Sequence, residues 1–189
     1  MPDPMRFAAT CWTIWIILWL LFALRTKPTQ RSEGIASRLR YSVLVTAGYV
    51  LLFWRRLVPI PLRETWISPI WALEVIGAAI MLAGIGLTLW ARVHLGANWS
   101  GTVTVKVNHG LIRTGPYARV RHPIYTGILL AAVGTALLQR QISGLLGVAL
   151  VFTGFWIKLK KEELFMSETF GAQYESYSRH TGALLPRLR

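Results

Sequence analysis

The chain has 189 residues, 53% of them hydrophobic, and carries a formal net charge of +13. Long apolar runs with few charges exclude an ordinary soluble domain and indicate an integral membrane protein. The sequence has no zinc-ligand cluster, RNA-binding motif or separate basic domain, so we expect neither a metal site nor a nucleic-acid partner. Its cations lie between apolar segments, as in proteins whose positive loops face the cytoplasm and anionic lipid. The single cysteine, Cys11, excludes an intramolecular disulfide.

The first apolar segment runs from about Phe7 to Leu24. It is longer than the core of a typical signal peptide and ends without small residues for cleavage, so we interpret it as a retained membrane span. The polar residues 25–40 that follow hold five cations and one acid, Glu33, and this balance predicts a cytoplasmic loop. The cations are Arg25, Lys27, Arg31, Arg38 and Arg40.

Two further spans, about Tyr41 to Trp54 and about Pro69 to Val93, complete a predicted N-terminal membrane region of residues 1–93. The second of them is rich in glycine and alanine, which let helices approach closely in lipid. Glu74 stands near one end of this span. An acid in a membrane segment suggests a function, but an ion pair with the neighbouring basic turn explains it equally well, so both interpretations stay open.

The second region, residues 94–189, is the predicted catalytic part of the chain and begins with a polar connector. Within the connector, Thr102 to Val107 alternates with period two, which predicts an extended segment. The residues Asn108 to Gly110 then predict a turn.

Two apolar segments, Ile124 to Leu138 and Ile142 to Ile157, are separated by only three residues and must form an antiparallel hairpin. The sequence therefore predicts an all-α integral membrane protein with about five transmembrane helices and its termini on opposite sides. After Ile157 we expect an amphipathic C-terminal helix. Its apolar face would hold Phe165, Phe170, Tyr174 and Tyr177.

The connector meets the hairpin at His122-Pro123. Proline disfavours a helical conformation in the residue before it and suits the first position of a helix. We therefore expect His122 just outside a helix that begins at Pro123. A helix start offers free backbone N–H groups and the positive end of a dipole, which together favour an anion. The prediction is a polar pocket at the mouth of a membrane helix.

An ordered series of short motifs in the C-terminal half resembles the isoprenylcysteine carboxyl methyltransferase family of integral-membrane, S-adenosylmethionine-dependent enzymes. Each motif alone is weak, but their order along the chain is specific. The motifs are His109 to Ile112, Gly115-Pro116-Tyr117, Arg121 to Gly127, Glu162-Glu163, and Phe170-Gly171 with Tyr174 and Tyr177.

The resemblance implies an S-adenosylmethionine pocket formed by the 94–123 connector, the last helical hairpin and the C-terminal helix. It implies that Glu162 holds the polar end of the cofactor, and that Arg121, Lys158 and Glu162 carry the catalytic roles. The cofactor contacts it implies are His109, Gly110, Leu111, Ile112, Tyr117, His122, Pro123, Ile124, Tyr125 and Glu162.

Lys158 departs from the family pattern, which has a substrate-carboxylate arginine four residues before the first glutamate of the pair. Lysine attracts an anion but lacks the planar paired donors of arginine. Arg121 is the other candidate anchor for the acceptor.

Three functions stay open. The first is methylation of a carboxylate on a lipidic or isoprenylcysteine-like acceptor, the second is methylation of a phospholipid amine, and the third is a membrane scaffold or reductase relative of the same fold. We expect a multi-pass protein of a bacterial inner membrane, in contact with membrane lipid, with the active site facing the cytoplasm.

Overall fold

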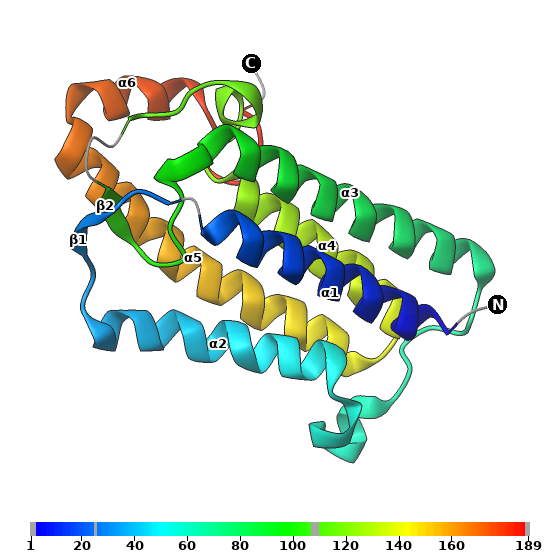
Figure 1. The fold of residues 1–189 in the computed structure, drawn as a ribbon. Coiled ribbons are helices and arrows are strands. Elements are labelled where there is room, and N and C mark those ends of the chain that lie inside the picture. The colour runs from blue at the N-terminus through cyan, green and yellow to red at the C-terminus, as the bar shows by residue number, and fades with distance from the viewer. Residues whose placement is uncertain (1–2, 25, 107–109, 188–189) are drawn as a thin grey trace.

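The computed structural model describes residues 3–24, 26–106 and 110–187. Five long helices run alternately in opposite directions, and shorter elements gather at the two ends of the bundle (Figure 1). The elements are α1 Pro4–Ala23, β1 Thr29–Ser32, α2 Ile35–Phe53, η1 Arg55–Leu57, η2 Ile60–Arg63, α3 Trp71–Leu95, η3 Gly96–Asn98, β2 Thr104–Lys106, η4 Gly115–Ala118, α4 Pro123–Gln139, α5 Ile142–Phe170 and α6 Ala172–His180.

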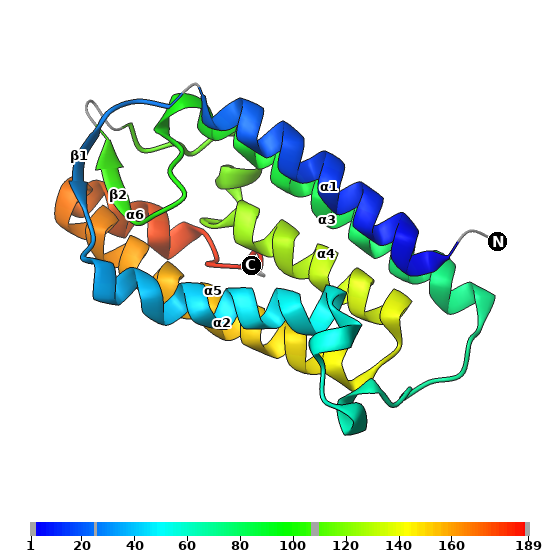
Figure 2. The same ribbon diagram turned by 60° about the horizontal axis from the view of Figure 1, so that its bottom comes forward.

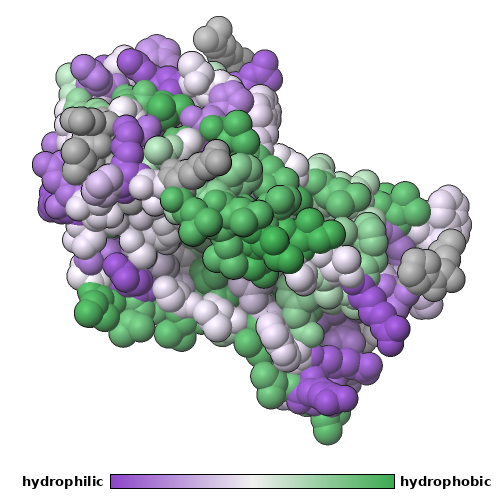
Figure 3. Space-filling view, viewed as in Figure 1, coloured by the Kyte–Doolittle hydropathy of each residue, from purple (hydrophilic) through white to green (hydrophobic). Residues whose placement is uncertain are grey.

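The helices confirm the prediction of an all-α multi-pass membrane protein. Four of those described, α1, α2, α3 and α5, are long and apolar enough to cross a membrane. Hydrophobic residues spread across the middle of the molecule, and hydrophilic residues gather towards both ends (Figure 3). The apolar helix α4 has 17 residues, or about 26 Å at 1.5 Å per residue, so the fifth span stays a prediction.

Glycines let α3 and α4 pack with their backbones in contact. A Cβ atom at Gly84 would collide with Ala131 N and lie 2.5 Å from Gly127 O. A Cβ atom at Gly77 would lie 3.0 Å from Gly134 O in the same interface. Small residues were expected to serve close packing in the third span, and these two glycines do so.

The helices α2 and α5 form a second close pair (Figure 2). A Cβ atom at Gly48 would lie 2.6 Å from Gly147 O, and one at Gly154 would lie 2.9 Å from Tyr41 O. These contacts fix the register of α5, the helix that carries Lys158 and Glu162.

The first helix, α1, lies across α3 and α4 and is fixed there by tryptophan hydrogen bonds. Trp12 Nε1 donates to Thr135 Oγ1 at 3.0 Å, and Trp15 Nε1 donates to Thr88 Oγ1 at 2.7 Å. Indole N–H groups inside an apolar bundle need such partners, because lipid offers none.

At the end of the bundle away from the connector, Glu74 Oε1 lies 2.9 Å from Arg140 Nη1. Arg140 forms the turn between α4 and α5 with a φ angle of 58°. Of the two interpretations of Glu74, the structure therefore favours the ion pair, although its partner is the hairpin turn and not the basic turn beside it.

Several boundaries differ from those expected. The helix α2 begins at Ile35 and includes Arg38 and Arg40, which were expected in a loop. The expected extended segment forms β2, which pairs antiparallel with the unpredicted β1. The helix α5 continues past Ile157 to Phe170, because residues 158–163 are good helix formers and the first break is Gly171, with φ of 48°. The expected turn at Asn108 and His109 lies outside the described residues.

Gly84→Ala should lower the stability of the protein by about 1–3 kcal/mol, because the added methyl group meets backbone atoms that cannot move aside. The matched control is Gly86→Ala on the same helix, where a Cβ atom meets nothing within 4 Å. That substitution should stabilise the helix by about 0.5–1 kcal/mol. Thermal unfolding in detergent measures both; equal effects of the two substitutions would contradict the packing described for α3 and α4.

Candidate active site

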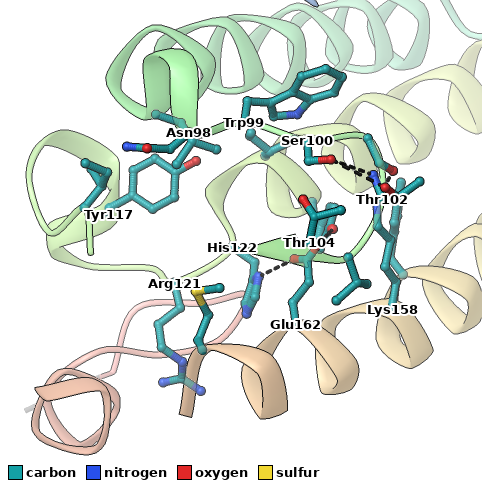
Figure 4. Close-up of a pocket in the computed structure, with 18 of the residues that line it drawn as sticks. Asn98, Trp99, Ser100, Thr102, Thr104, Tyr117, Arg121, His122, Lys158 and Glu162 are labelled. Atoms are coloured by element: carbon teal, nitrogen blue, oxygen red, sulfur yellow. Dashed lines mark hydrogen bonds and ion pairs between the residues drawn. The ribbon is translucent and has the colours of Figure 1, made fainter. Parts of the chain in front are cut away.

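A cavity of about 290 Å³ lies at the connector end of the bundle (Figure 4). The connector, the first turns of α4, the second half of α5 and α6 all line it, and these are the segments in which the family resemblance implied a cofactor pocket. The helix α1 also contributes Trp15 and Trp19, which were not expected there. The lining thus includes charged or polar residues, among them His122, Lys158 and Glu162, and aromatic residues such as Trp15 and Trp19.

The charged part of the lining is organised around His122. This residue precedes α4 in a non-helical conformation, with φ of −122° and ψ of 58°, as expected for a residue before proline. One turn later Tyr125 stacks on the His122 ring, and its hydroxyl donates to Glu162 Oε1 at 2.5 Å. The local start of α4 thus aims two side chains at α5.

Each nitrogen of the His122 ring faces one of two neighbouring carboxylates of α5, those of Glu162 and Glu163. Nδ1 lies 3.5 Å from Glu162 Oε2, and Nε2 lies 3.4 Å from Glu163 Oε1. Burial alone would lower the pKa of His122, but hydrogen bonding and charge from Glu162 and Glu163 outweigh it, and the pKa lies above the ordinary value. An imidazolium between two carboxylates is the charge state that this arrangement favours.

Arg121 is held by groups outside the cavity centre. Its guanidinium lies 2.6 Å from Glu163 Oε1 and donates to the carbonyls of Ser178 and Thr181 at 3.1 and 2.5 Å. In Figure 4 it points away from Lys158, towards α5 and α6. These contacts give Arg121 a way to position Glu163 and the C-terminal segment, and they leave it poorly placed to anchor an acceptor.

The C-terminal segment fixes the backbone on either side of this arginine. Arg121 N donates to Gly182 O at 2.9 Å, and His122 N donates to Ala183 O at 3.0 Å. Tyr177, on α6, donates from its hydroxyl to Tyr117 O at 2.6 Å. The tail therefore closes over the connector and helps to place His122.

Lys158 stands on α5 one turn before Glu162 and is 7% exposed. Its Nζ donates to Gly101 O at 2.9 Å and lies over the rings of Tyr125 and Tyr41, at 5.3 and 5.5 Å from the centroids. Among the described residues, no carboxylate oxygen lies within 4.0 Å of this ammonium. It is a buried cation held by dipoles and aromatic faces.

Most of the residues expected to contact a cofactor line the cavity. Pro123 is fully buried and begins α4 without lining the cavity, while His109 lies outside the described residues. The expected cofactor contacts that do line it are Gly110, Leu111, Ile112, Tyr117, His122, Ile124, Tyr125 and Glu162. Arg121 and Lys158, which were expected in catalytic roles, line it as well.

Other lining residues were missed. Thr104 and Tyr174 both line the cavity, and Thr104 Oγ1 is buried without a hydrogen-bond partner among the described residues. The sequence predicts Tyr174 only on the apolar face of the C-terminal helix, not in the cavity lining. Trp15 and Trp19 are four residues apart on α1, and this helical spacing was the one available sign that they share a face.

The fold and the site together define a class: a multi-pass membrane protein with a charged pocket between its last hairpin, its connector and its C-terminal helix. The model of the phospholipid methyltransferase family matches residues 73–173. The chain belongs to this family.

Similar proteins point in the same direction. A "Probable protein-S-isoprenylcysteine O-methyltransferase" of Oryza sativa subsp. indica is 28% identical over 152 residues, covering 77% of this chain and 79% of the relative. "Protein-S-isoprenylcysteine O-methyltransferase A" of Arabidopsis thaliana is 29% identical over 154 residues, covering 77% of both chains. These relatives confirm the resemblance found in the motifs.

The fold is also shared with a solved structure, that of the eukaryotic intramembrane Ras methyltransferase ICMT (isoprenylcysteine carboxyl methyltransferase). The two structures have a TM-score of 0.54 and 24% sequence identity, over 78% of this chain and 52% of the other.

Because its folded-state pKa is raised, His122 should stabilise the protein fully below its unfolded pKa of about 6.5, and this stabilisation should disappear as pH rises through the folded pKa. The difference in melting temperature between the unmodified protein and His122→Gln should therefore be largest below about pH 6.5 and shrink as the pH rises above it. The exposed His180→Gln is the control. A difference that does not vary with pH would mean that His122 carries no extra proton in the folded state.

Proposed function

We propose that this protein transfers the methyl group of S-adenosylmethionine to a carboxylate on a lipidic, isoprenylcysteine-like acceptor. The observation that carries the proposal is the buried ammonium of Lys158, which lines the cavity without a carboxylate partner among the described residues. A buried cation attracts an anionic ligand strongly, because little water competes for it. The names of the relatives, which state methylation of isoprenylcysteine, support the same chemistry.

The residues of the cavity fit S-adenosylmethionine. Glu162 offers a carboxylate to the ammonium of its amino-acid end, and Thr104 Oγ1 is a buried hydroxyl without a hydrogen-bond partner among the described residues. Tyr117 and Trp99 add aromatic surface for the adenine and for the cationic sulfur. When bound, the cofactor supplies a methyl group activated by its sulfonium.

The residues of the chain then need to do little proton chemistry. A carboxylate is already ionised and nucleophilic at neutral pH, so the rate depends on placing it in line with the methyl group and removing its water. Lys158 orients the acceptor carboxylate, and Glu162 orients the donor, one helical turn away on the same face of α5. Trp15, Trp19 and Phe155 give the acceptor's hydrocarbon chain an apolar wall.

The second candidate is methylation of a phospholipid amine, which the description of the family favours. An amine acceptor is positively charged in water and must lose a proton before it reacts. The ammonium of Lys158 would repel that charged form from the cavity, whereas it would attract a carboxylate. We therefore place the carboxylate first.

The cavity should face the cytoplasm of a bacterial inner membrane. Arginines gather at the cavity end of the bundle, on β1, the start of α2, the connector and α6. Cytoplasmic loops carry such an excess of positive charge.

In a Cys11→Ser background, an impermeant thiol reagent should label Ile60→Cys in intact cells and leave Ser176→Cys unlabelled; the reverse pattern would exclude this orientation.

With labelled S-adenosylmethionine and N-acetyl-S-farnesylcysteine, the purified protein should form a product whose methyl label is released by base, as an ester requires. Incubation with phosphatidylethanolamine should form no product. A base-stable label on the phospholipid would instead establish the amine reaction.

Lys158→Ala should raise the acceptor KM by about tenfold or more and leave cofactor affinity within about twofold, since it removes one charged contact. Lys158→Arg should retain most of the activity, because a guanidinium also binds carboxylates. Lys160→Ala is the matched control, since the ammonium of Lys160 lies over Trp156, 5.0 Å from its ring centroid, and Lys160 does not line the cavity. An acceptor KM unchanged in Lys158→Ala would remove Lys158 from the site.

A further inference from the structure

A buried acid outside the motifs holds one wall of the cavity. Glu33 follows β1, precedes α2, and is 6% exposed. Ser37 Oγ donates to its Oε2 at 2.6 Å, and the Tyr41 hydroxyl donates to its Oε1. The backbone of Val103 completes the set: its N–H donates to Glu33 Oε1 at 3.2 Å, and its carbonyl accepts from Glu33 N at 3.1 Å.

The segment that Glu33 holds, Gly101 to Thr104, forms part of the cavity lining. Val103 is 1% exposed and packs against Phe165 of α5. The carbonyl of Gly101 accepts the hydrogen bond from Lys158 Nζ. The wall is therefore fixed at two points: by the Glu33 carboxylate at Val103, and by the Lys158 ammonium at Gly101.

The same acid is linked to Lys158 from a second side. The Tyr41 ring, whose hydroxyl donates to Glu33, lies 5.5 Å from Lys158 Nζ. Lys161, also on α5, donates to Ser37, which in turn donates to Glu33. Glu33 thus bonds Val103, two residues from the Gly101 carbonyl that accepts from Lys158, and Tyr41, one of the two rings beneath the ammonium.

The carboxylate is suited to this role because it stays charged. Burial would raise the pKa of Glu33, but the hydrogen bonds from Ser37, Tyr41 and Val103, together with the charge of Lys161, outweigh burial and hold the pKa below its ordinary value. An ionised acceptor makes shorter and stronger hydrogen bonds than a neutral one.

We propose that Glu33 is a positioning residue of the active site: by holding Val103 and Tyr41, it sets the Gly101–Thr104 wall and directs the Lys158 ammonium at the acceptor. The role of Glu33 in holding the wall is independent of the proposed function, whereas its role in directing Lys158 at the acceptor rests on that function.

The test combines hydrogen exchange with kinetics on Glu33→Gln. The amide keeps the size of the side chain, but its nitrogen cannot accept a hydrogen bond from Ser37 or Tyr41. Exchange of the backbone amides of residues 101–104 should accelerate about tenfold. The KM for N-acetyl-S-farnesylcysteine should rise about tenfold, while kcat and the affinity for S-adenosylmethionine stay within about twofold. Tyr41→Phe, which keeps the ring over Lys158, should shift both readouts less.

Glu74→Gln is the matched control, because it removes a partly buried carboxylate from an ion pair at the opposite end of the bundle. It should lower thermal stability without changing the acceptor KM or the exchange of residues 101–104. Unchanged exchange in Glu33→Gln would overturn the proposal, as would a rise in KM matched by Glu74→Gln. If the unmodified protein methylates no acceptor, the proposed function fails, and hydrogen exchange alone still decides whether Glu33 holds the wall.

Discussion

The imidazole of His122 between the carboxylates of Glu162 and Glu163 is the interaction on which the site depends. It joins the start of α4 to α5, and it offsets the repulsion between two adjacent acids near the wall of one cavity. Removing one partner of such a buried ionic cluster typically costs about 3–5 kcal/mol, since the remaining charge has no compensation. Arg121 adds a second cation to Glu163 and brings in the C-terminal segment.

Helix packing supplies the accuracy that this cluster requires. Lys158 and Glu162 are fixed by the register of α5 against α2, and that register depends on glycines whose replacement would force the backbones apart. Glycines do the same for α4 against α3, and therefore for His122 and Tyr125 at the start of α4. In lipid, where apolar side chains gain little by leaving their solvent, such close contacts carry much of the helix association.

Two opposite charges line the cavity from one face of α5: the ammonium of Lys158 and, one helical turn later, the carboxylate of Glu162. Under the proposed function, a cationic donor and an anionic acceptor would be held next to each other, and their opposite charges would favour the binding of both. Aromatic residues of α1 and α5 line the same cavity, and apolar surroundings of this kind strengthen charge interactions.

Local sequence predicted the helical membrane fold, and the family resemblance supplied the expected site residues. Apolar runs gave the helices, and the proline after His122 gave the start of α4. Long-range contacts could not be predicted: Arg121 was considered as an acceptor anchor, but its partners are Glu163 and carbonyls at residues 178 and 181, which no local pattern relates to it. Glu33 was visible only as the one acid in a basic segment, since its role depends on β1 pairing with β2 and on Val103, 70 residues away.

Titration of S-adenosylmethionine into detergent-purified protein, followed by calorimetry, tests the central claim that the cofactor occupies the cavity next to His122 and Glu162. The account predicts that the unmodified protein and the exposed control Glu168→Gln bind with equal affinity. Glu162→Gln should bind at least about tenfold more weakly while remaining folded, because a charge-assisted contact is lost. Equal affinity in Glu162→Gln and in the unmodified protein would contradict the account and move the cofactor out of this cavity.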